Sequence, residues 1–208
     1  PNATLQSFYG INWGGDQDLI DILIQSNLPH DKILNATSLE FDFVSNLTTD
    51  QISFEYMFLS EEYRIDNCDY SDAFAFLIKK ADNSEPYQNI ALVPNTTIPI
   101  TSLTINGARD CPRNVSYFGG FNPTNSPTNF NGQTKVLKAN AQIEADTKYH
   151  IKLVIADHGD SRGRYDSAVF LKAGSFVGSK SLGSDVILCS GTSATIDATT
   201  TNATAYKW

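Results

Sequence analysis

Short apolar runs separated by turn-forming residues constrain this fold more than any other feature of the sequence. Residues 16–26 have the apolar spacing of a short helix, but no helical pattern separates the later runs. Several runs alternate apolar and polar residues, as half-buried strands do. We therefore expect an all-β fold, a β-sandwich or jelly roll with a short N-terminal helix. The expected strands are residues 37–46, 52–59, 73–79, 89–94, 99–106, 134–143, 149–156 and 167–173.

Burial and loop length can also be predicted. Residues 73–79, 149–156 and 167–173 carry apolar side chains on both faces, which is typical of central strands covered on both sides. Residues 107–135 are rich in Pro, Gly and Asn. This composition predicts a long ordered loop.

Acidic residues crowd into two connections, 60–72 and 157–166, each beside a strongly apolar strand. If the two strands that flank each connection pair with one another, each connection is a hairpin at one end of the sandwich. If both hairpins point the same way, four or more carboxylates converge. Carboxylates that converge repel one another unless a cation or an arginine neutralises them.

Calcium is the predicted cofactor, because this cation takes six to eight oxygen ligands and the acidic connections offer many. They do not form an EF-hand, since a loop begun at Asp157 has Ala168 where glutamate is required. The alternative is that Arg64, Arg162 and Arg164 make ordinary ion pairs with the acids. The candidate metal ligands are Glu61, Glu62, Asp69, Asp72, Asp157, Asp160 and Asp166.

Charge and cysteine content narrow the function classes. The net charge of −8 and the lack of a basic stripe argue against a nucleic-acid partner. No apolar run approaches the roughly 20 residues of a membrane helix, so we expect no membrane span here. Cys68 and Cys111 lie in loop-like segments and predict a disulfide in an oxidising compartment, with two unrelated thiols as the alternative. Cys189 is then left over.

The chain divides into a sandwich domain, residues 1–176, a small and polar linker, residues 177–184, and a second segment, residues 185–208. The second segment resumes a strand-turn-strand rhythm with Cys189 and Trp208. This pairing is typical of the first strands of an immunoglobulin-like domain, whose second cysteine would lie further on. We therefore expect the chain to be a segment of a longer protein.

Aromatic and asparagine side chains in the long loop suggest a ligand site, because sugar rings stack on aromatics and amides bind hydroxyls. The candidate ligand residues are Tyr117, Asn122 and Asn125. The alternative is that the loop aromatics close the end of the core, which we expect of Phe118 and Phe121.

Two enzyme hypotheses are weaker. One takes a carboxylate from each acidic connection as a pair for glycoside hydrolysis. The other reads Ser167, Asp166 and His158 as part of a catalytic triad. No nucleophile elbow is present, so we expect no catalysis.

The sequence also resembles a known family. The elements Ser-Glu-Glu-Tyr at 60–63, Asp-x-Phe-Ala-Phe at 72–76 and Asp-Ser-Ala-Val-Phe at 166–170, in this order and with strands 89–94 and 149–156 between them, are similar to the choice-of-anchor L domain of bacterial proteins. The resemblance covers roughly residues 5–176. It implies export, a secreted or cell-surface location, a multidomain protein with adjacent immunoglobulin-like repeats, and no catalytic residue. Its departures are the cysteines at 68 and 111 and the inserted Arg-Gly-Arg at 162–164.

Together these features predict a non-catalytic extracellular adhesin module that calcium stabilises and that binds glycan or another surface ligand. The alternative is a purely structural spacer in a large surface protein. A glycoside hydrolase is the weakest of the three.

Overall fold

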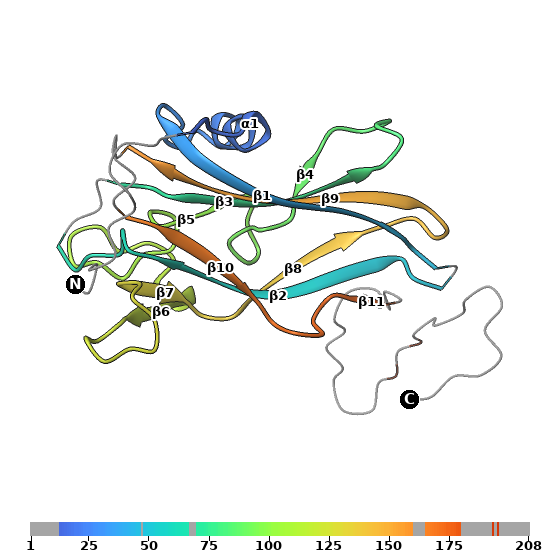
Figure 1. Ribbon diagram of the computed structural model, residues 1–208. Helices are drawn as coiled ribbons and strands as arrows, with labels where there is room; N and C mark the ends of the chain where they lie inside the picture. Colours follow the sequence, from blue (N-terminus) through green and yellow to red (C-terminus); the bar gives the residue numbers. More distant parts are fainter. Residues whose placement is uncertain are drawn as a thin grey trace.

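The computed structural model describes residues 13–46, 48–66, 70–159 and 165–179, with 193 and 195 beyond them. Two layers of strands lie one above the other, and the helix covers the upper layer (Figure 1). The elements are α1 (Gln17–Gln25), β1 (Ile33–Val44), β2 (Gln51–Ser60), β3 (Ala73–Lys80), β4 (Gln88–Asn89), β5 (Ile100–Thr101), the 3₁₀ helix η1 (Val115–Tyr117), β6 (Phe118–Phe121), β7 (Gly132–Thr134), β8 (Leu137–Gln142), β9 (Lys148–His158), β10 (Ser167–Leu171) and β11 (Val177–Ser179).

Each layer is an antiparallel sheet. The upper one, sheet A, has the strand order β1-β9-β3-β4, and β5 also pairs with β3. The lower one, sheet B, has the order β10-β2-β7-β6, and β8 and β11 also pair with β2. The predicted all-β sandwich with one short helix is therefore confirmed.

The strands that flank each acidic connection do not pair, so the predicted hairpins are wrong. In sheet A, β3 pairs with β9, with Ala73 opposite Ala156. In sheet B, β2 pairs with β10, with Ser60 opposite Ser167. Each connection therefore crosses from one sheet to the other. The physical reason is that β2 and β3 both carry rows of aromatic side chains, which bury each other when the two strands face across a sandwich.

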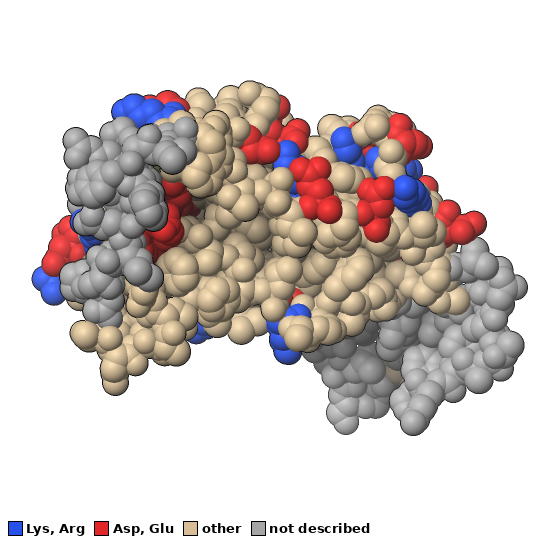
Figure 2. All heavy atoms as spheres, viewed as in Figure 1, with Lys and Arg blue, Asp and Glu red and all other residues tan. Residues whose placement is uncertain are grey.

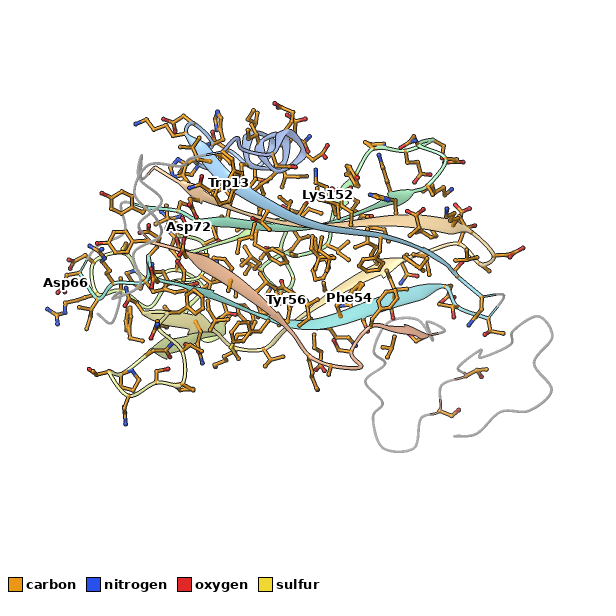
Figure 3. The ribbon with its side chains drawn as sticks, viewed as in Figure 1. Trp13, Phe54, Tyr56, Asp66, Asp72 and Lys152 are labelled. Atoms are coloured by element: carbon orange, nitrogen blue, oxygen red, sulfur yellow. The ribbon has the colours of Figure 1, made fainter. Side chains whose placement is uncertain are left out.

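The core between the sheets is largely aromatic. The ring centre of Phe54 lies 4.7 Å from that of Phe76, and the ring centre of Tyr56 lies 5.6 Å from that of Phe74. All four side chains are buried, and Figure 3 shows Phe54 and Tyr56 pointing between the layers. Burying a side chain of this size contributes roughly 1.5–3 kcal/mol.

Two of the three strands that were expected to be central are buried in the structure. β3 and β9 are buried over most of their length. β10 instead lies at an edge of sheet B, and its Phe170 and Leu171 are 49% and 44% exposed. Strand β10 has apolar residues on both faces, but it is not buried on both faces. Among the described strands it pairs only with β2, which leaves it at the edge of the sheet.

Three irregular regions differ from expectation. The strand expected at 89–94 is reduced to β4, because the side-chain oxygen of Asn89 accepts the amide of Phe76 at 3.1 Å in place of a longer ladder. The strand expected at 99–106 is reduced to β5. The loop expected at 107–135 contains the β6–β7 hairpin.

Helix α1 lies where the apolar spacing predicted it, on the outer face of sheet A. Leu19 and Leu23 pack with Ala75 and Val154 of the sheet. Asp16 caps the helix, because its side chain accepts the amide of Leu19 at 3.1 Å.

Lys152 of β9 ties the helix to the sheet (Figure 3). Its Nζ lies 2.5 Å from Asp16 Oδ2 and 2.7 Å from Asp18 Oδ2. The lysine side chain is only 9% exposed. A charge that is this buried requires partners of opposite sign, and the start of α1 supplies two.

The first residues of the predicted linker belong to sheet B, since Val177–Ser179 form β11 and pair with residues 51–53 of β2. The rest of that linker and the immunoglobulin-like segment, residues 185–208, lie outside the described residues apart from 193 and 195. Within the described ranges, no helix is long and apolar enough to cross a membrane.

Replacing Asp16 with Ala should destabilise the fold by about 1–3 kcal/mol, because both the helix cap and one partner of buried Lys152 are lost. Asp16→Asn keeps the capping oxygen and should cost less. Asp21→Ala, at an exposed acid of the same helix, is the control and should stay within about 0.5 kcal/mol of wild type. Urea unfolding measures all three, and an equal loss in Asp16→Ala and Asp21→Ala would contradict the assignment.

Candidate functional site

Both acidic connections reach the same end of the sandwich. Strand β10 is antiparallel to β2, so it begins beside the end of β2. Strand β3 is antiparallel to β9, so it begins beside the end of β9. Residues 61–72 and 159–166 join these strand ends. Figure 2 shows acidic atoms set back from the surface at this end of the molecule. The acids of the two connections therefore meet, as expected, although crossovers bring them together instead of hairpins.

Asp72 lies at the centre of this acidic end. It directly precedes β3 and is 0% exposed. Figure 3 shows it between the two layers. Its Oδ2 accepts the hydroxyl of Ser167 at 2.7 Å, and its Oδ1 accepts the amide of His158 at 3.2 Å. One carboxylate thus ties the start of β3 to the end of β9 and to the start of β10 in the other sheet.

Glu61 and Glu62 follow β2 and are also buried, since only 4% of Glu61 and 5% of Glu62 is exposed. The amide of Glu61 donates to the carbonyl of Asp166 at 3.0 Å, and its Oε2 accepts the amide of Asp166 at 3.2 Å. The side-chain amide of Asn131 donates to the Glu61 carbonyl. The amide of Glu62 donates to the Ser60 hydroxyl at 2.9 Å. The first connection is therefore bonded both to the second connection and to the loop before β7.

The remaining predicted metal ligands differ in burial. Asp157, near the end of β9, is buried, and its Oδ2 accepts the side-chain amide of Asn35 at 2.9 Å. Asp166, just before β10, is exposed. Asp69 and Asp160 lie outside the described residues. Of the seven predicted ligands, five can thus be placed, and all five lie at this end.

Burial controls the ionisation of these acids. It raises the pKa of Asp72 well above the ordinary value, the charges of Glu62 and Asp157 raise that pKa further, and the two hydrogen bonds that Asp72 accepts oppose the rise. Burial also raises the pKa of Glu61. Desolvation and like charge both disfavour an ionised Asp72, so a proton or a nearby cation stabilises this end.

The described acids do not form a ready-made metal site. Among the described residues, no three His, Cys, Asp or Glu side chains are grouped so that they could hold one ion. Arg64, one proposed ion-pair partner, has its guanidinium carbon 4.4 Å from the centre of the Tyr165 ring. Arg162 and Arg164 lie outside the described residues. The calcium site therefore stays a prediction.

The triad fragment considered from the sequence is not assembled. A serine nucleophile must donate its proton to a histidine ring. The Ser167 hydroxyl donates to Asp72 instead, and His158 reaches Asp72 through its backbone amide. The Ser167 hydroxyl therefore bonds to the buried carboxylate, and among the described residues it makes no hydrogen bond to the ring of His158.

The predicted ligand residues lie on the loop that rests against this end. Tyr117 belongs to η1 and is partly buried against the core. The side-chain amide of Asn122 donates to the carbonyl of Phe130 at 2.9 Å, so this residue closes its own turn. Asn125 is exposed. Phe118 and Phe121 pack against the core, as expected.

Cys111 is partly buried in the connection before β6. Cys68 and Cys189 both lie outside the described residues, so the pairing of Cys68 with Cys111 stays a prediction.

Three polar residues that hold the acids were not among the predicted site residues: Asn35, Asn131 and Ser167. Asn35 is 122 positions from its partner Asp157, so no local pattern could connect them. Only Ser167 carried a local signal, because it follows Asp166 at the start of a strand. That signal was interpreted as a possible nucleophile.

Replacing Asp72 with Asn should flatten the dependence of stability on pH. Because burial raises the folded-state pKa of Asp72 above 3.8, the folded protein keeps a proton that the unfolded chain releases. The stability that this residue contributes is therefore lost as pH rises through the folded-state pKa. Urea unfolding in chelator from about pH 4 to about pH 8 measures the slope.

The matched control for this experiment is Asp110→Asn. It removes one charge at an exposed acid and should keep the wild-type slope. If wild type and Asp72→Asn lose stability equally as pH rises, Asp72 ionises like an ordinary surface acid and the electrostatic account of this end is wrong.

A comparison with family models agrees with the resemblance seen in the sequence. The model of the choice-of-anchor L domain matches residues 1–177, which include both acidic connections and nearly all of the sandwich. Comparisons with curated proteins and with solved structures gave no match. The chain therefore belongs to the choice-of-anchor L family, a non-enzymatic domain of surface-anchored or secreted bacterial proteins.

Proposed function

We propose that this domain is an adhesin module in which bound calcium holds the acidic end and the adjacent loop recognises a glycan or another surface ligand. The observation that carries the proposal is the complete burial of Asp72 with Glu62 and Asp157 close enough to raise its pKa. A fold that buries like charges together gains stability from a cation bound among them.

The chemistry of this end suits calcium. Calcium binds oxygen and completes its shell with carbonyls and water, so it does not need three carboxylates in contact with it. The hydroxyl of Ser71, next to Asp72, is buried and makes no hydrogen bond with any described residue. Buried polar groups normally have a partner, and a bound cation or its water would supply one.

The loop is the favoured recognition surface because it rests on the acidic end. Asn131 bonds to the Glu61 carbonyl, and Gly132 of β7 lies opposite Ser60 of β2. Recognition residues commonly lie on loops that rigid strands position. A cation that fixes the acidic end would also hold this loop still and lower the entropic cost of binding a ligand.

Millimolar calcium should raise the melting temperature. A ligand that binds only the folded state adds about 2.7 kcal/mol at a hundredfold excess over its Kd, which is roughly 5–10 °C for a domain of this size. Asp72→Ala should remove most of the increment, whereas Asp110→Ala should keep it. Identical melting curves in calcium and in chelator would exclude the metal from the proposal.

Asn125→Ala should lower retention on a glycan array without changing the melting temperature, because this side chain is exposed. Asn140→Ala, at an exposed asparagine of β8, is the control and should bind fully. Tyr117→Ala and Asn122→Ala are expected to lower both binding and stability, since one packs on the core and the other closes a turn. No retention across a broad array would favour the structural spacer.

A further inference from the structure

A polar hollow lies on the outer face of sheet A, at the opposite end of β3 from Asp72. Its volume is about 730 Å³, within the range of small-molecule sites. Its walls come from β1, from β9 and from the β3–β4 connection, and its lining includes Glu40, Asp42, Lys79, Tyr87, Asp146 and His150. Figure 2 shows acidic and basic groups interspersed along the upper edge, where Figure 1 places these elements.

Two of the three lysines that line the hollow are already paired with acids. Lys80 lies 2.6 Å from Glu144, and Lys148 lies 2.8 Å from Asp42. His150 lies 2.7 Å from Asp42 through Nδ1 and 3.3 Å from Glu40 through Nε2. These pairs hold the lining in place and leave little of its positive charge for a ligand.

Lys79 is the exception. It is partly buried, and among the described residues its side chain makes no ion pair and no hydrogen bond. Its ammonium lies 4.2 Å from the ring centre of Tyr87, a cation–π contact that fixes its position without neutralising its charge. The hollow therefore contains one oriented positive charge with no carboxylate of its own.

A second hollow, of about 490 Å³, shares Lys79, Tyr87 and Asn83 with the first and extends to helix α1. Asn83 is exposed, and the Tyr87 hydroxyl makes no hydrogen bond within the described ranges. Both groups can donate to and accept from hydroxyls. An extended molecule could therefore lie across Tyr87 with parts in both hollows.

We propose that these two hollows form a binding site for an acidic saccharide, whose carboxylate pairs with Lys79 and whose hydroxyls contact Asn83, Tyr87 and the acids of the lining. A polyanion such as a heavily sulfated glycan fits worse, because Glu40 and Asp146 would repel it. A neutral sugar would leave Lys79 unneutralised. The chemistry that remains is one carboxylate on a polyhydroxylated chain. This site shares with the proposed function only the premise that the module binds sugar.

The test is an array of uronate-containing, sialylated and neutral oligosaccharides, probed with the full chain in chelator. The best-retained acidic oligosaccharide and its carboxyl-reduced counterpart are then titrated calorimetrically. We expect the acidic form to bind at least tenfold more tightly, and this preference to weaken with salt. Lys79→Met should abolish the preference while leaving the melting temperature near wild type.

Lys138→Met is the matched control, because Lys138 is an exposed lysine on the other sheet with no ion pair among the described residues. It should keep the full preference for the acidic form. The proposal is overturned if no acidic oligosaccharide is retained, if the carboxyl-reduced form binds equally well, or if Lys79→Met keeps the preference.

The same measurements, made in calcium as well as in chelator, separate this site from the loop. Loss of acidic-sugar binding in Lys79→Met but not in Asn125→Ala supports the hollow. Loss in Asn125→Ala but not in Lys79→Met overturns the hollow and leaves the loop proposal intact. If only neutral sugars are retained, and Lys79→Met does not change their retention, the hollow is likewise overturned and the loop proposal stays intact.

Discussion

Two strands that follow each other in the chain, β2 and β3, face each other across the core instead of pairing side by side. The contact between the rings of Phe54 and Phe76 makes this arrangement favourable, because it buries an aromatic row from each strand. The rest of the structure depends on it. A connection between facing strands must cross from sheet to sheet, and the connection from β9 to β10 crosses at the same end. The meeting of the acids follows from the packing of the core.

The fold class could be predicted from the sequence, but the pairing of the strands could not. Alternation and turn residues identify strands, but they do not say which strand lies beside which, so the expected hairpins were wrong. The convergence at Asp72 could still be anticipated, because either arrangement brings both acidic connections to strand ends. Long-range contacts such as Asn35 with Asp157 left no local trace. The site at Lys79 and Tyr87 could not be predicted either, because the spacing of these residues is that of an ordinary strand and turn.

The two candidate sites lie at opposite ends of one strand. Asp72 precedes β3 and Lys79 lies near its end, a separation of roughly 23 Å for seven residues of extended chain. The two sites favour ligands of opposite charge. At the first end, acids are buried together and favour a cation. At the second end, ion pairs neutralise most charges and one ammonium remains without a carboxylate. A rigid buried strand between them keeps the two sites at a fixed distance.

Phe176, in the turn between β10 and β11, joins the sheets at their open side. Its ring centre lies 4.4 Å from that of Phe54 in sheet B and 5.3 Å from that of Phe43 in sheet A. Within the described part of the chain, only β11, three residues long, follows it in sheet B. In a surface protein under tension, a pull on the chain after β11 would load those three residues first and then the Phe176 ring that contacts both sheets. Phe176 would then act as a mechanical stop that protects the sandwich from unravelling.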